Sequence, residues 1–77
     1  MNLALYNKQE LLHEALSSRF EAQRTEALAT LQVYYSDSAG IGEHPQVVEE
    51  MAKQVEKLAA AEDALNCLKR NFEQTTN

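Results

Sequence analysis

Few side chains in this 77-residue chain could carry out chemistry. They are two histidines, His13 and His44, one cysteine, Cys67, and scattered carboxylates. Nucleophilic catalysis needs a thiol or hydroxyl beside a base, and a third group that orients the base. Cys67 falls on the face of its expected helix opposite the apolar seam, and both histidines are expected far from it. The sequence therefore predicts no catalytic site, and we expect a protein that is not an enzyme.

A metal or phosphate site finds equally little support. Asp37, Glu43 and His44 share one expected loop, but no second pair of Cys or His accompanies them and their spacing is not that of a calcium loop. The stretch 40–42 lacks the Lys-Ser/Thr of a P-loop, so turn formation explains its glycines. His44 is interpreted as the residue that precedes the helix entry at Pro45. We expect no metal and no cofactor.

Composition and charge narrow the class of partner. The formal net charge is −5, with 12 acidic residues interspersed among 7 basic ones, so a phosphate backbone would meet net repulsion and no basic stripe. A single cysteine fits a reducing compartment. The segment Met1 to Leu5 has no basic region, and the apolar runs are far below the ~18 residues of a membrane span. We expect a cytoplasmic protein that binds neither nucleic acid nor membrane.

The periodicity of apolar residues predicts two long helices. The first is expected over about 7–35, with Asn7 as its cap and Glu10 completing a capping box, although a start capped by Asn2 fits equally well. A loop over 36–44 holds both glycines. Pro45 suits the first turn of a second helix over about 45–72. The expected fold is all-α, an antiparallel two-helix hairpin that forms one domain over residues 1–77.

The two helices are expected to meet along one apolar seam. Tyr34 should lie near Val48 and Leu31 near Met51, because the helices have similar lengths and fold back at the loop. Glu62 stands at a seam position, where it either pairs with Arg19 or keeps its carboxylate in water at the edge of the seam. The predicted seam comprises Leu12, Leu16, Phe20, Ala27, Leu31, Tyr34, Val48, Met51, Val55, Leu58, Leu65 and Phe72.

Apolar residues outside this seam predict a second interface. A core of two helices is thin, and below ~80 residues a chain without disulfides or metals usually needs association. We therefore expect a homodimer that forms a four-helix bundle with coiled-coil packing. The alanines near the middle of the second helix fit either close helix approach or simple helix propensity. The residues left over are Leu11, Leu28, Val33, Tyr35, Val47, Leu68, Ala59, Ala60, Ala61 and Ala64.

The second half of the chain also resembles a known group of proteins. The stretch Ser38-Ala39-Gly40-Ile41-Gly42-Glu43-His44-Pro45 continues through Val48-Glu49-Glu50 to Leu58-Ala59-Ala60-Ala61-Glu62-Asp63. Over this part it resembles small uncharacterised helical proteins encoded by tailed phages, particularly those of marine cyanobacteria. The resemblance implies a phage or accessory protein in a bacterial cytoplasm, and it brings no activity and no site residues.

Two functions follow as hypotheses. The first is a non-enzymatic interaction or structural protein, a self-associating hairpin that binds another protein. The second is a small regulator that binds a ligand or metal inside a helical bundle, through Gln23, Glu62 and neighbouring histidines, although no histidine stands at the (i, i+3) spacing that such sites use. For the first hypothesis, the candidate partner surface comprises Tyr35, Asp37, Glu43 and His44.

Overall fold

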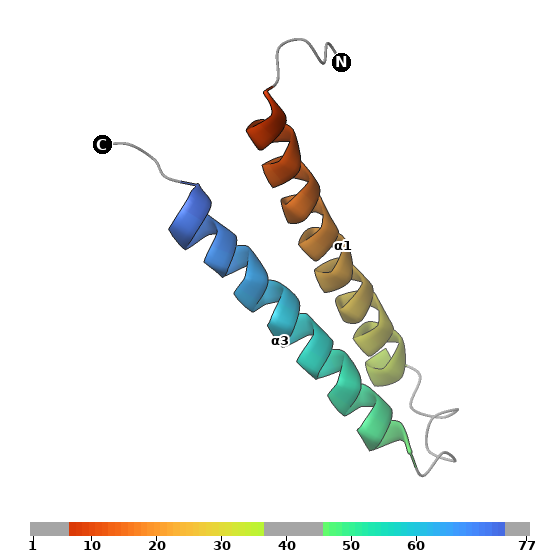
Figure 1. The fold of residues 1–77 in the computed structure, drawn as a ribbon. Coiled ribbons are helices and arrows are strands. Elements are labelled where there is room, and N and C mark those ends of the chain that lie inside the picture. The colour runs from red at the N-terminus through yellow and green to blue at the C-terminus, as the bar shows by residue number, and fades with distance from the viewer. Residues whose placement is uncertain (1–6, 37–45, 74–77) are drawn as a thin grey trace.

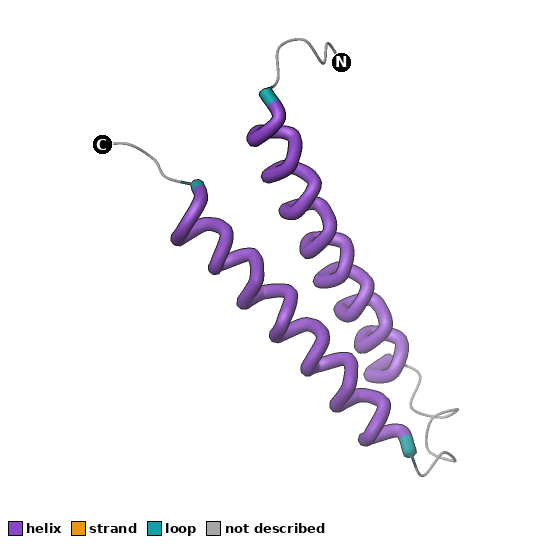
Figure 2. Tube along the Cα trace, in the orientation of Figure 1, coloured by secondary structure: helices purple, strands orange, loops and turns teal. Residues whose placement is uncertain are grey.

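The fold is a helical hairpin (Figure 1). The computed structural model describes residues 7–36 and 46–73. They form helix α1 (Lys8–Ser36, 29 residues) and helix α3 (Val47–Phe72, 26 residues), which pack against each other. Figure 2 shows the described residues as helix apart from short stretches at the ends. The predicted all-α hairpin is thereby confirmed, while residues 37–45, which include most of the expected loop and Pro45, lie outside the described residues.

Helix α1 begins at a reciprocal cap. The backbone N–H of Glu10 donates to Asn7 Oδ1 at 2.7 Å, and the backbone N–H of Asn7 donates to Glu10 Oε1 at 3.1 Å. Each side chain thus satisfies a backbone donor that has no partner within the helix, which is the capping box predicted from Asn7 and Glu10. The other predicted start, at Asn2, lies outside the described residues.

The remaining helix ends also follow from local chemistry. At the end of α1 the Ser36 hydroxyl donates to the carbonyl oxygen of Gln32 at 2.7 Å. In α3 the first turn carries Glu49 and Glu50, and the last turn carries Lys69 and Arg70. These charges oppose the helix dipole at both ends. The backbone N–H of Glu73 then closes α3 by donating to the carbonyl oxygen of Leu68 at 3.2 Å.

The hairpin is elongated and forms a single layer. Its extents are 53 × 27 × 17 Å, so one dimension is that of two helices side by side and another is little more than one helix diameter. Figure 1 shows α1 and α3 close together near residues 36 and 46 and farther apart towards residues 8 and 72. Each helix can therefore turn only one narrow stripe toward its neighbour. Neither helix contains an apolar stretch long enough to cross a membrane.

The core between the helices is small. Among the described residues the buried apolar side chains are Ala27, Leu31, Ala61 and Leu68, and no large side chain is fully buried. Ala27 and Ala61 are the most completely covered, because alanine leaves little bulk between two helix backbones that approach closely. The alanine cluster predicted from sequence thus contributes Ala61 to the helix contact, while Ala59 and Ala60 are exposed.

Candidate interaction surface

Helix α1 faces α3 with a regular heptad stripe. Its less exposed residues recur at steps of three and four, which keeps one stripe in line along the helix. The predicted residues Phe20, Ala27, Leu31 and Tyr34 lie in it. Leu12 and Leu16 were also predicted there, but both are exposed, because they lie at the end of α1 where the two helices are farther apart (Figure 1). The stripe comprises His13, Ser17, Phe20, Arg24, Ala27, Leu31 and Tyr34, and Gln23 and Thr30 beside it are also partly covered.

Helix α3 is rotated relative to the prediction. The predicted row Met51, Leu58 and Leu65 is at least partly covered, but its companion row is Val47, Gln54, Ala61 and Leu68. The expected companion row of Val48, Val55 and Glu62 lies outside the contact, and Phe72 is exposed. A seam through that row would bring Glu62 and Lys69 out of water, which is costly without close partners. The rotation keeps these charges in solvent and leaves two valines exposed.

Polar contacts between the helices show how they are aligned. Glu62 Oε2 lies 3.6 Å from Arg24 Nε. Arg24 is five residues after Arg19, the partner expected for Glu62, and so lies more than one helical turn nearer the loop. Both side chains are partly exposed, so the pair contributes at most ~1 kcal/mol to the free energy of unfolding. At the other end His13 Nε2 lies 3.1 Å from Glu73 Oε2. The alignment of α1 with α3 therefore differs from the predicted one.

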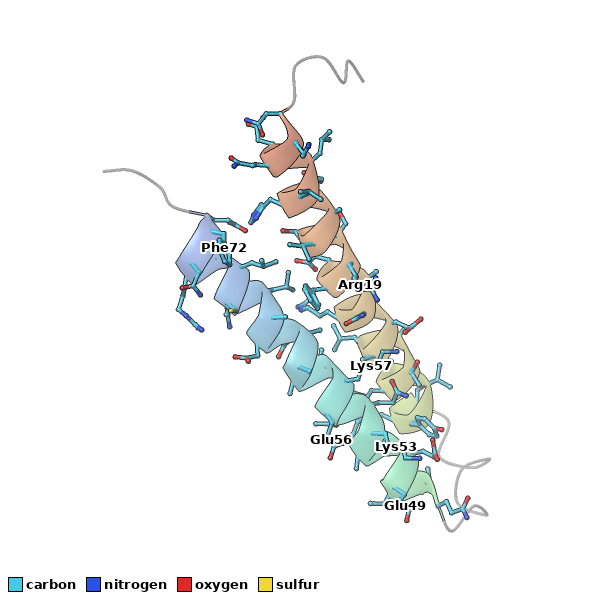
Figure 3. The ribbon with its side chains drawn as sticks, in the orientation of Figure 1. Arg19, Glu49, Lys53, Glu56, Lys57 and Phe72 are labelled. Carbon is cyan, nitrogen blue, oxygen red and sulfur yellow. The ribbon has the colours of Figure 1, made fainter. Side chains whose placement is uncertain are left out.

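A second interhelical pair joins Lys57 and Glu26. The Lys57 ammonium donates to Glu26 Oε1. This hydrogen bond, and then the positive charge of Lys57, hold the pKa of the Glu26 carboxyl below its ordinary value. Lys53, which Figure 3 labels next to Lys57, donates to Glu50 one turn earlier on α3. This side of the hairpin is consequently polar.

The two interhelical pairs mark opposite broad faces of the hairpin. Arg24 and Glu26 are two positions apart on α1, and therefore ~200° apart around the helix. Lys57 and Glu62 are five positions apart on α3, or ~140°. Since each pair spans the seam, one bridges it on one face and the other bridges it on the opposite face.

An apolar surface continues from the Arg24–Glu62 pair toward the loop end. On α1, Leu28 and Tyr35 stand within ~40° of Arg24, and on α3, Val55 and Val48 stand within ~40° of Glu62. All four are exposed side chains. We call this surface the valine face, defined by Leu28, Tyr35, Val48 and Val55. The sequence flagged Leu28 and Tyr35 as left outside the seam, but it placed both valines inside the seam.

A separate open cleft lies between the diverging helix ends. Its volume is about 880 Å³. Figure 3 labels Phe72 at this end of α3. Carboxylates of Glu10, Glu14 and Glu73 stand around it, so its rim is acidic. The apolar part of its lining comprises Leu12, Leu16, Leu68 and Phe72.

The remaining candidate residues do not converge on one site. Tyr35 is exposed in the last turn of α1, while Asp37, Glu43 and His44 lie outside the described residues. Cys67 is an exposed free thiol.

The second hypothesis depended on Gln23 and Glu62 with nearby histidines. Gln23 is half-buried, whereas Glu62 pairs with Arg24, and His13 lies within hydrogen-bond distance of Glu73. Within residues 7–36 and 46–73, no three His, Cys, Asp or Glu side chains gather as metal ligands would.

Sequence reasoning missed three side chains of the interface. Arg24 was not considered, although it continues the strict seven-residue series of Ser17 and Leu31. Lys57 lies beside the seam, where its pairing with Glu26 depends on helix rotation. Gln54 lies within the seam, and its buried Oε1 has no hydrogen-bond partner among the described residues.

Comparison with known proteins gave no relationship on which to rely. No family model, no curated protein and no solved structure matches this chain.

Proposed function

We propose that this chain is a non-enzymatic interaction protein, a helical hairpin that associates with a second copy of itself and binds another protein in the cytoplasm. The twofold dimer would complete a four-helix bundle. The observation that carries the proposal is the imbalance between buried and exposed apolar side chains.

That imbalance is large for a monomer. Four apolar side chains are buried among the described residues, and two of them are alanines. A core of this size supplies little of the free energy needed to fold a chain of 77 residues. Apolar groups exposed in such number usually mark an interaction surface. The large exposed ones are Leu11, Leu12, Leu16, Leu28, Val33, Tyr35, Val48, Val55 and Phe72.

Sedimentation equilibrium of the purified chain over nanomolar to high micromolar concentration tests self-association. A reversible monomer–dimer equilibrium is the expected result, and a single monomeric species over the whole range would contradict it. Affinity capture from the native cell tests the second part. We expect a protein that is retained by the wild-type chain and released when its exposed apolar residues are replaced by charged ones.

A further inference from the structure

We propose that the second copy docks on the valine face, with the twofold axis parallel to the long axis of the hairpin and the two loops at the same end of the dimer. This inference rests on the proposed self-association and specifies the surface that carries it. Four exposed apolar side chains, Leu28, Tyr35, Val48 and Val55, form that surface.

The two broad faces of the hairpin differ in what they offer a partner. The valine face is apolar over the half nearer the loop, where two rows, one from each helix, stand side by side. Over the same half the opposite face carries Glu26, Lys57, Glu50 and Lys53, joined in two ion pairs. Covering those charges would cost desolvation, whereas covering the valine face removes apolar area from water. The valine face is therefore the one that gains from burial.

The size of the face suits a dimer. The hairpin measures 53 by 27 Å across its broad side, so half of that side is about 700 Å² in projection. Two such halves bury about 1400 Å² in total, which lies within the ~1,200–2,000 Å² of a stable specific interface. The charged half of the face then forms the rim of the contact.

Charge complementarity selects the orientation. When the twofold axis runs along the hairpin, α1 of one copy lies over α3 of the other. Residues of the two copies that lie at the same height along the axis then face each other. Arg24 and Glu62 stand at one height, since they pair within a chain. Arg24 also pairs with Glu21 of its own chain, whose carboxylate oxygen lies 3.9 Å from Arg24 Nη1. Arg24 of each copy then stands at the height of Glu62 of the other copy, and the two arginines lie among the four carboxylates of Glu21 and Glu62. With the axis across the helices at that height, each charge would instead meet its own copy, and like charges repel. With the axis across the helices at Val55, Arg24 and Glu62 of the two copies would not meet, so only the parallel axis brings Arg24 of one copy to Glu62 of the other.

Two exposed valines provide a matched test of the face. Val48 is 73% exposed and lies on the valine face, whereas Val33 is 62% exposed and lies seven positions after Glu26, on the opposite side of α1. Val48→Lys and Val33→Lys make the same chemical change at similarly exposed sites, so both monomers should fold. Sedimentation equilibrium should show the dimer dissociation constant raised at least tenfold by Val48→Lys and changed less than twofold by Val33→Lys.

The outcomes separate this inference from the proposed function. Dimerisation that survives Val48→Lys but is weakened by Val33→Lys overturns the docking face and leaves self-association intact. Equal effects of the two variants likewise overturn it. A wild-type chain that is monomeric at every concentration would contradict the proposed self-association, and the proposed docking face would then be wrong as well.

The lone cysteine tests the orientation without any substitution. Cys67 is exposed and can carry a spin label. It stands twelve positions from Val55 along α3. If the loops lay at opposite ends and the valine faces still met at the height of Val55, two labels would be separated by ~36 Å along the helix axes, at 1.5 Å per residue. With the loops at the same end that axial separation vanishes, and the expected distance is only the width of a four-helix bundle, roughly 30 Å or less between outward-pointing labels. A dominant distance above 40 Å overturns the orientation.

Discussion

Replacing Leu31 by alanine should remove a large part of the stability of this protein. Leu31 is 7% exposed and is the largest side chain that the hairpin buries in α1. The change deletes three carbon atoms, and at ~0.8 kcal/mol for each buried CH₂ the lost transfer free energy is about 2.4 kcal/mol. A cavity adds to this, although the thin core lets the surroundings relax, so the expected total is ~2.5–3.5 kcal/mol.

Urea denaturation at one fixed protein concentration measures this loss. For a small chain with a slope near ~1 kcal/mol per molar urea, the unfolding midpoint should fall by ~2 M or more. Leu12→Ala is the control, because it deletes the same atoms from a side chain that is 59% exposed. Its expected loss is about 1 kcal/mol, from the covered fraction of the same 2.4 kcal/mol. Equal midpoint shifts for the two variants would refute the assignment of the helix interface.

Three further changes probe other parts of the interface. Gln54→Leu should stabilise the chain by ~1 kcal/mol, because it replaces by carbon a buried oxygen that has no hydrogen-bond partner among the described residues; a lower denaturation midpoint would contradict this. Ala61→Leu should destabilise it by ~1–3 kcal/mol through overpacking at a residue that is almost fully covered, whereas Ala59→Leu, on the exposed surface, should be nearly neutral. The pairing with Lys57 lowers the pKa of Glu26. The contribution of this pair to the stability of the fold is therefore present above the ordinary pKa of 4.5, and it is lost as the pH falls through the lowered pKa. The stability difference between wild type and Glu26→Gln should therefore shrink below pH 4.5, and a difference that grows there would show that the sign is wrong.

Local signals in the sequence were enough for the helices and the hairpin. The Asn7–Glu10 capping box places the start of α1, and the spacing of Phe20, Ala27 and Leu31 identifies its inner side, because both depend only on residues within a few turns. Such signals act within one helix. They need no knowledge of its neighbour.

Helix rotation and alignment were harder to predict, because they depend on a balance across both helices. Met51 and Leu58 fit two different seams on α3, one completed by Val48 and Val55 and the other by Ala61 and Leu68. The first seam contains larger apolar side chains, and it was therefore the one predicted. The second keeps Glu62 in solvent, and the cost of desolvating a charge exceeds the gain from two valines.

The candidate interaction surface follows directly from that rotation. The valine face exists because Val48 and Val55 are turned out of the seam, so a sequence pattern read for a single interface could not reveal it. When a helix contributes to two interfaces, the spacing of its apolar residues does not say which residue belongs to which interface until one of the two contacts is known.

The dependence of thermal stability on protein concentration tests the central claim most directly, since a core completed by a second copy must be lost on dilution. For a dimer, a tenfold change in concentration alters the free energy of unfolding by ~1.4 kcal/mol, which corresponds to a shift of roughly 4 °C in the Tm of a unit of this size. Circular dichroism melts of the wild-type chain should show the Tm rising by about that amount for each decade between 1 and 100 μM. A Tm that stays constant over this range would contradict the claim that the hairpin folds by self-association.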